Sequence, residues 1–283
     1  MTAVTGARPA GGPAGPARPR RGGGVRALWS GNVGAVVARN LRAARSSSGV
    51  VVLSGFFEPV FYLLALGYGL GSYVGTVTTP DGTEVPYAAF IAPALLAVSA
   101  MNGAVYDSTW NVFFKMHYGK LYDAMLSTSL GPLDVALGEI LYALLRGGVY
   151  ACGFLTVMQV MGLNLAPTAV LAVPAVLLVA FAFASVGMAV TSFMKTFQQM
   201  DWITFVMLPM FLFSATFYPL SVYSEVVQRI IQVLPLWHGV ELVRGLTTGT
   251  AGVDALGHVA YYLALVVLGI TATTLRLRSL FLD

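Results

Sequence analysis

One stretch without charged residues limits what this chain can fold into. The 48 residues between Arg146 and Lys195 contain no Asp, Glu, Lys or Arg. A helix needs about 20 apolar residues to cross the roughly 30 Å hydrocarbon core of a bilayer. The stretch is therefore too long for one helix, and the turn-forming residues 162–167 divide it into two. We predict an all-α integral membrane protein.

The same length criterion predicts six transmembrane helices in the whole chain. Charged residues make up 10% of the sequence and the mean hydropathy is +0.77, whereas soluble domains carry about 25% charged residues. Lipid as the solvent accounts for this composition. The spans are expected at about residues 50–73, 87–106, 139–161, 168–194, 202–218 and 255–275.

The Lys and Arg residues are divided unequally between the two sides of these spans. Thirteen of the sixteen fall in the N-terminal region, the loops after the second and fourth spans, and the C-terminus. Arg229 and Arg244 lie on the other side, and Arg146 lies within a span. The positive-inside rule then predicts that both termini are cytoplasmic.

The N-terminal region divides into two parts before the first span. Residues 1–24 hold seven Gly, four Pro and four Arg without an apolar run, which predicts a disordered basic tail. Residues 25–283 then form one transmembrane domain. Its first part, residues 25–49, has apolar residues at helical spacing with Arg between them, typical of an amphipathic helix on a membrane surface. A short linker helix is the alternative.

Two segments between spans are amphipathic. In the cytoplasmic loop at residues 108–133, residues 113–126 are predicted to form a short amphipathic helix on which a partner could dock. A membrane-surface helix without a partner is equally compatible with the pattern. On the external side, residues 222–234 have one apolar face, Pro235 ends that helix, and residues 236–246 begin another. We expect a re-entrant helical hairpin in the outer leaflet.

Two charged residues fall at similar depth inside predicted spans, Glu58 in the first and Arg146 in the third. An ionisable group in lipid costs several kcal/mol unless it is paired or hydrated, so we hypothesise that these two pair. The pair would form either a gate or a purely structural contact. Trp237 is predicted to anchor the chain at the membrane interface, and His238 and His258 lack a third ligand for a metal ion.

The first span carries two further candidate features. A GxxxG motif formed by Gly67 and Gly71 permits close helix packing, either between two copies or within one chain. Phe61, Tyr62 and Tyr68 are candidates for lining a substrate path, although aromatic residues in spans commonly serve packing or face lipid.

Several runs of this sequence resemble the permeases of ABC-2 type exporters. Residues 58–71 (EPVFYLLALGYGLG) resemble the first span of the nodulation-factor and lipo-oligosaccharide exporter permeases, and residues 119–127 and 130–134 (GKLYDAMLS and LGPLD) resemble the loop that meets the ATPase. Residues 217–219 and 234–245 (FYP and LPLWHGVELVRG) resemble the region before the last span. Asp123 and Ser129 depart from the expected Glu and Pro. The resemblance covers about residues 30–280.

The resemblance implies a non-catalytic subunit of an ATP-driven exporter in the bacterial plasma membrane, with an amphipathic drug, lipid or lipo-oligosaccharide as substrate. Its partners would be ABC ATPase subunits, a second permease copy or paralogue and membrane lipids, with no nucleic acid. No GxxxxGK[ST] phosphate-binding loop occurs in the sequence, so ATP and Mg²⁺ would bind the partner ATPase, and no cofactor is expected in this chain.

The resemblance also assigns residues to two functional segments. The segment that couples to the ATPase would comprise Phe114, Lys115, Gly119, Lys120, Leu121, Tyr122, Asp123, Met125 and Leu126. The external hairpin would comprise Tyr218, Pro219, Pro235, Trp237, Glu241 and Arg244.

Two other classes of protein stay open as alternatives. A secondary transporter or channel working alone is disfavoured because the spans show no internal repeat. A membrane-embedded lipid-modifying enzyme is disfavoured because Asp107, Asp123 and Asp134 are too scattered in sequence to form an acidic metal-binding cluster.

Overall fold

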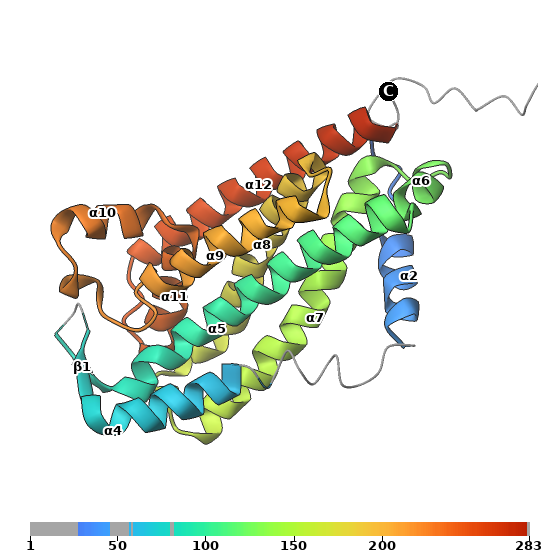
Figure 1. The fold of residues 1–283 in the computed structure, drawn as a ribbon. Helices are drawn as coiled ribbons and strands as arrows, with labels where there is room; N and C mark the ends of the chain where they lie inside the picture. The colour runs from blue at the N-terminus through green and yellow to red at the C-terminus, as the bar shows by residue number, and fades with distance from the viewer. Residues whose placement is uncertain (1–27, 46–56, 58, 80–81, 282–283) are drawn as a thin grey trace, which may run out of the picture.

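The structure is a computed structural model that describes residues 28–45, 57, 59–79 and 82–281. Long helices run side by side along one direction and form an elongated bundle (Figure 1). α2 (Val33–Arg45), α6 (Leu121–Leu126) and the C-terminal end of α12 (Asp254–Phe281) lie at one end, called here the α2 end. The hairpin of β1 (Thr76–Thr78) and β2 (Glu84–Pro86) lies at the opposite end with α10 (Glu225–Val233), called the α10 end.

Four helices in the described part of the chain are long and apolar enough to cross a membrane. They correspond to the second, third, fourth and sixth predicted spans. The second helix continues twelve residues past its predicted end, the third begins seven residues earlier than predicted, and the sixth ends six residues later, whereas the fourth agrees within one residue at each end. They comprise α5 (Tyr87–Tyr106) with its continuation to Tyr118, α7 (Pro132–Val160), α8 (Ala172–Phe193) with the 3₁₀ turn Pro167–Leu171 before it, and α12.

The first and fifth predicted spans correspond to shorter helices. In the first, the described apolar helix is Pro59–Val74, which includes the π-helical segment Leu63–Leu70 and α4 (Gly71–Val74). In the fifth, α9 (Asp201–Phe213) follows the 3₁₀ turn Phe197–Met200 and stops five residues before the predicted end. Ser214 donates its hydroxyl to the carbonyl of Met210 at 2.6 Å, and Ala215 takes a left-handed φ of 55°. These two residues end the helix.

α8 lies at the centre of the bundle and packs against α5, α7, α11 (Pro235–Thr248) and α12. Small residues let the helices approach closely, as is common where lipid gives no hydrophobic drive for association. A Cβ atom on Gly269 of α12 would lie 2.5 Å from the backbone carbon of Ser185 in α8. Two residues further along α8, a Cβ atom on Gly187 would lie 2.3 Å from Oγ of Ser108. The core therefore depends on glycine at helix crossings.

The amphipathic helix predicted at residues 25–49 is present as α2, which packs against α7. Val36 is its buried apolar residue and sits over Gly138, where a Cβ atom would come within 2.4 Å.

Asp134, in the first turn of α7, accepts hydrogen bonds from the backbone N–H groups of Ser30 and Asn32 at 2.8 and 3.0 Å. The same carboxylate accepts the N–H of Gly131 at 2.8 Å. One buried anion thus caps α7 and fixes the start of α2. The predicted tail at residues 1–24 lies outside the described residues.

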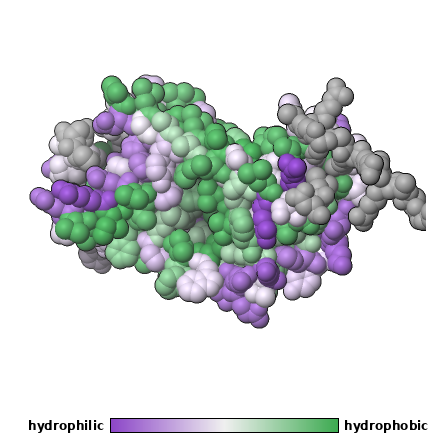
Figure 2. Space-filling model, turned by 90° about the horizontal axis from the view of Figure 1, so that it is seen from above, coloured by the Kyte–Doolittle hydropathy of each residue, from purple (hydrophilic) through white to green (hydrophobic). Residues whose placement is uncertain are grey.

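Hydrophobic residues cover the middle of the molecule. Figure 2 shows them across the centre of one face, with hydrophilic residues gathered toward the ends. The loop between the first and second predicted spans contains the antiparallel pair β1–β2, with Val77 opposite Val85. The external amphipathic segment forms the two predicted helices, α10 and α11, which meet at Leu234 and Pro235 after the 3₁₀ turn Leu220–Val222.

Candidate functional site

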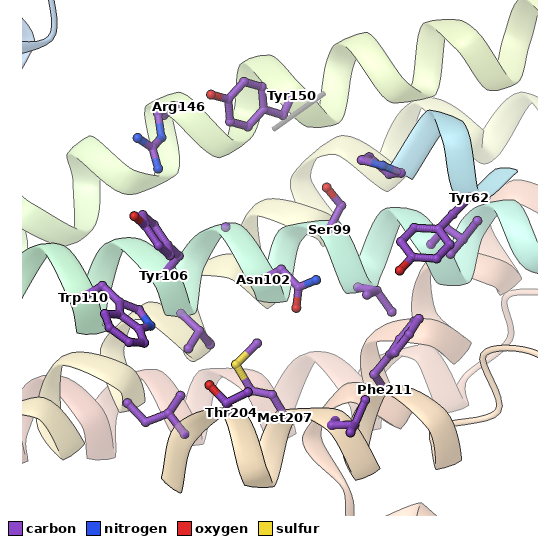
Figure 3. A pocket seen from close by; sticks show the side chains of 17 residues that line it. Tyr62, Ser99, Asn102, Tyr106, Trp110, Arg146, Tyr150, Thr204, Met207 and Phe211 are labelled. Atoms are coloured by element: carbon purple, nitrogen blue, oxygen red, sulfur yellow. The ribbon is translucent and has the colours of Figure 1, made fainter. Parts of the chain in front are cut away.

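A cavity of about 810 Å³ lies between α5, α7, α9 and the start of the first apolar helix. Figure 3 shows side chains from these elements facing one another across it. The volume falls in the range of about 300–1,000 Å³ that is usual for ligand pockets. The lining residues are Pro59, Tyr62, Leu95, Val98, Ser99, Asn102, Gly103, Val105, Tyr106, Trp110, Arg146, Tyr150, Ile203, Thr204, Met207, Leu208 and Phe211.

The two ends of the cavity differ in character. Tyr62 and Phe211 form one end, with their rings 6.3 Å apart and edge to face. Arg146 and Trp110 lie toward the other end (Figure 3). Ser99, Asn102 and Thr204 supply polar groups between the ends, among apolar side chains.

Arg146 forms an ion pair with Asp107, through Nη2 and Oδ1. Asp107 begins a π-helical segment, Asp107–Asn111, in which Nδ2 of Asn111 donates to the same carboxylate oxygen at 2.7 Å. π-helical turns inside α-helices often occur at functional sites. The predicted partner Glu58 lies outside the described residues, so its pairing stays a prediction. The sequence reading missed Asp107 because it placed this residue just beyond the second span.

The coupling segment differs from its prediction as a single helix over residues 113–126. Phe114–Tyr118 is a π-helical end to the long helix that begins at Tyr87. The chain breaks at Gly119 and Lys120, where Lys120 takes a left-handed φ of 44°, and α6 then starts at Leu121. The prediction of one continuous helix was wrong, because the left-handed backbone at Lys120 interrupts the ladder of helical hydrogen bonds.

Burial divides the nine predicted coupling residues. Tyr122 is 0% exposed and packs in the hydrophobic core with Met125 and Leu126, so these three form no docking surface. The family resemblance assigned them to the coupling segment, and a resemblance does not show which side chains the fold buries. Lys115 and Leu121 are partly buried, and Nζ of Lys115 lies 2.5 Å from Oε2 of Glu139 in α7. The exposed members are Phe114, Gly119, Lys120 and Asp123.

A second segment lies against the exposed coupling residues. Nε2 of His117 is 3.1 Å from the carbonyl oxygen of Met194, and the ring centres of Phe114 and Phe197 are 6.1 Å apart. Residues 195–199, between α8 and α9, are exposed in this position. The sequence reading missed this segment because only the tertiary fold places the two loops side by side. Together they form one surface at the α2 end.

The glycines of the GxxxG motif pack within the chain. A Cβ atom on Gly67 would lie 3.3 Å from Cβ of Ala88 in α5, and one on Gly71 would lie 3.7 Å from the ring of Tyr87. The structure therefore uses the motif to seat the first apolar helix on α5. Of the three predicted path-lining aromatic residues, Tyr62 lines the cavity, whereas Phe61 and Tyr68 are exposed and do not.

The external hairpin is fastened by Arg244, which is almost fully buried. Its guanidinium donates to the carbonyl oxygens of Phe90 and Ala215 at 3.3 and 2.8 Å and to Oε1 of Glu241 at 2.7 Å. Beside it is a second cavity, of about 910 Å³, whose walls include Pro219, Trp237, His238 and Glu241.

Three aromatic or imidazole groups also meet at this cavity. The Nδ1 atoms of His238 and His258 are 2.7 Å apart, and the ring of Tyr261 stacks on His238 at 3.9 Å. This contact could not be predicted from sequence, because the two histidines are 20 residues apart on different helices. Tyr218 is exposed. Pro235 is the first residue of α11, and its carbonyl oxygen accepts a hydrogen bond from the Tyr262 hydroxyl at 2.7 Å.

Comparison with known proteins identifies the architecture. The family model of the ABC-2 type transporter matches residues 31–247, well over half of the chain. The chain belongs to the ABC-2 type transporter family. As the resemblance implied, it is an ABC-2 permease, a multi-pass membrane protein and a transporter subunit.

Relatives of this ABC-2 permease agree over most of its length. It is 33% identical to nodulation protein J of Sinorhizobium fredii over 211 residues, which is 74% of this chain and 79% of that protein. It is 31% identical to nodulation protein J of Rhizobium leguminosarum bv. trifolii over 245 residues, or 86% of this chain and 92% of that protein. The nodulation protein J of Rhizobium meliloti is 29% identical over 217 residues, which is 76% of this chain and 81% of that protein.

Proposed function

We propose that this permease is the membrane subunit of an ATP-driven exporter that moves an amphipathic drug, lipid or lipo-oligosaccharide out of the cytoplasm or the inner leaflet. The cavity of about 810 Å³ is the observation that carries the proposal. Its aromatic and apolar walls suit a hydrophobic tail, and the polar groups of Ser99, Asn102 and Thr204 with Arg146 suit a headgroup. The second cavity, beside the external hairpin, lies on the proposed exit route.

The surface at the α2 end is the proposed docking site for the ATPase subunits. Exposed Phe114, Lys120 and Asp123 supply it from the coupling segment, and residues 195–199 extend it. The same end carries Arg39, Arg42, Lys195 and Arg278, and by the positive-inside rule this charge supports the proposal that the α2 end faces the cytoplasm. Closure of the ATPases would push on α6 and on the Phe114–Tyr118 end of the long helix that begins at Tyr87. That push would tilt the helices that enclose the cavity.

A second copy or a paralogue of the permease is the proposed partner within the membrane. α9 supports this proposal, because it makes few contacts inside its own chain and exposes large apolar residues, including Trp202, Phe205 and Leu208. Phe61 and Tyr68 add exposed aromatic surface on the neighbouring first apolar helix.

Reconstitution tests the proposed function directly. The permease would be co-expressed with the ATPase encoded beside it, purified and placed in liposomes, where ATP hydrolysis and movement of amphiphiles are measured. We expect co-purification, and hydrolysis that rises in the presence of transported compounds. Transport that proceeds without ATP or without the ATPase would contradict the proposal and favour a stand-alone transporter.

A further inference from the structure

We infer that the cavity between α5, α7 and α9 takes amphiphiles with a negatively charged headgroup, such as a phosphate, sulfate or carboxylate, and that Arg146 holds that headgroup. The inference rests on the proposed function, because it names the class of compound that the exporter's cavity would bind. Three features of the site carry it: the charge of Arg146, the N–H groups of Arg146 that have no acceptor among the described residues, and the change from a charged end to an aromatic end along the cavity.

Among the described residues that line the cavity, one side chain is charged, the cation Arg146. Its partner Asp107 does not line the cavity, and its side chain is 7% exposed against 25% for Arg146. The carboxylate therefore lies behind the guanidinium, where it holds the arginine in place while the arginine faces the cavity.

The guanidinium of Arg146 has donors to spare. Arginine carries five N–H donors in a planar fork, and the hydrogen bond to Asp107 uses the Nη2 atom. In the described part of the chain no second acceptor for Arg146 is found. A phosphate, sulfate or carboxylate can accept two such bonds side by side. An ionised headgroup in a membrane cavity needs this kind of partner, because an unpaired charge there is costly.

The rest of the cavity suits an apolar tail and gives the ligand one orientation. Phe211 of α9 and Tyr62 of the first apolar helix line the part farther from Arg146, and Met207 of α9 lies between the two ends. With its headgroup at Arg146, a ligand would extend its tail along α9 toward the contact between Tyr62 and Phe211, as Figure 3 lets the reader follow. A ligand with the opposite orientation would place its charge among aromatic rings without a partner.

Binding to the purified permease in nanodiscs tests the inference without the ATPase. The probes are oleoyl lysophosphatidic acid and oleoyl lysophosphatidylcholine, which share a tail and differ in headgroup charge. We expect the acidic probe to bind at least about tenfold more tightly, the size of effect of one hydrogen bond to a charged group. Equal affinities in the wild-type protein would overturn the inference, whatever any variant does.

Variants then assign the preference to Arg146. We expect Arg146→Gln to abolish most of the preference and Arg146→Lys to keep part of it, because lysine retains the charge and loses the planar fork. Asp107→Asn should preserve or increase the preference, since it removes the competing anion. Arg276→Gln, at an arginine of α12 that lies over the ring of Phe193 and outside the cavity, is the matched control. A preference unchanged in a folded Arg146→Gln protein would overturn the role of Arg146.

The proposed function is tested separately, by transport and ATP hydrolysis in the complete exporter. Tight binding of the acidic probe without ATP-driven movement supports the headgroup site, occupied then by a resident acidic lipid, and contradicts the export function. ATP-driven movement of both probes with equal affinity contradicts the headgroup site and leaves the export function standing.

Discussion

The guanidinium carbon of Arg244 lies 3.9 Å from the centre of the Phe90 ring. The same guanidinium donates to the backbone carbonyl of Phe90 and to that of Ala215, in the segment after α9. A single side chain thus joins the external hairpin, the start of α5 and the end of α9. In an interior with little water, the aromatic face and the carbonyl oxygens take the place of hydration for this cation.

Replacing this arginine should destabilise the protein strongly. We expect Arg244→Met to lower the free energy of unfolding by about 3–5 kcal/mol, because it removes the hydrogen bonds to the carbonyl oxygens of Phe90 and Ala215, each worth about 1.5–3 kcal/mol from a charged donor. Thermal unfolding in nanodiscs measures the change. Arg229→Met, at an exposed arginine on α10, is the matched control and should leave stability nearly unchanged. Equal melting temperatures for the two variants would contradict the assignment.

Two glycines of α12 should respond differently to the same substitution. Gly269→Ala places a Cβ atom 2.5 Å from the Ser185 backbone, so α8 and α12 must separate. We expect a loss of about 1–3 kcal/mol, as for other overpacked sites. Gly257→Ala meets no atom within 4 Å and should stabilise the helix slightly. Unfolding in a denaturant series measures both, and a neutral Gly269→Ala protein would show that this crossing is looser than described.

Substitutions at two adjacent residues of α6 should have different effects, one on the stability of the protein and the other on docking of the ATPase. Tyr122 is fully buried, so Tyr122→Ala should cost about 3–5 kcal/mol. Asp123 is exposed, so Asp123→Lys should leave the melting temperature unchanged and weaken binding of the ATPase subunits. Co-purification yield and thermal unfolding, measured on both variants, check this. Normal ATPase binding and coupled hydrolysis in the Asp123→Lys protein would remove that residue from the docking surface.

The carboxylate of Asp134 should control whether α2 stays on α7. Asp134→Ala removes the acceptor for the Ser30 and Asn32 N–H groups, each a charge-assisted bond worth about 1.5–3 kcal/mol. We expect faster trypsin cleavage at Arg39 and Arg42 of α2, while the bundle keeps its helical content. Asp123→Ala, at the exposed position in α6, should not change the cleavage rate. Equal rates in the two variants would show that packing of Val36 alone holds α2.

Hydrophobic length and amphipathic spacing predicted much of the fold, because both are local properties of the sequence. They located the four long apolar helices, α2 and the two helices of the external hairpin. They failed where the outcome depends on contacts between distant residues. The burial of Tyr122, the left-handed backbone at Lys120 and the end of α9 at Ser214 follow from how the helices pack.

The candidate site was predicted less completely than the fold. Arg146 was identified as a charged residue within a span and Tyr62 as a candidate path-lining residue, and both line the cavity. The other lining residues could not be predicted, because hydrophobic periodicity does not show which face of each helix points toward the cavity. Asp107 illustrates the limit, since several acidic residues stand at a suitable distance along the chain and only the three-dimensional arrangement selects one.

The shared cap at Asp134 sets an order of events during synthesis. Ser30 precedes its acceptor by 104 residues, an interval of about 5–20 s at common elongation rates of about 5–20 residues per second. Throughout that interval the first amphipathic helix has no anion to hold its N-terminal end. Its final position is therefore decided late, when the start of α7 leaves the ribosome, and the α2 end of the bundle closes only after the first half of the chain has been synthesised.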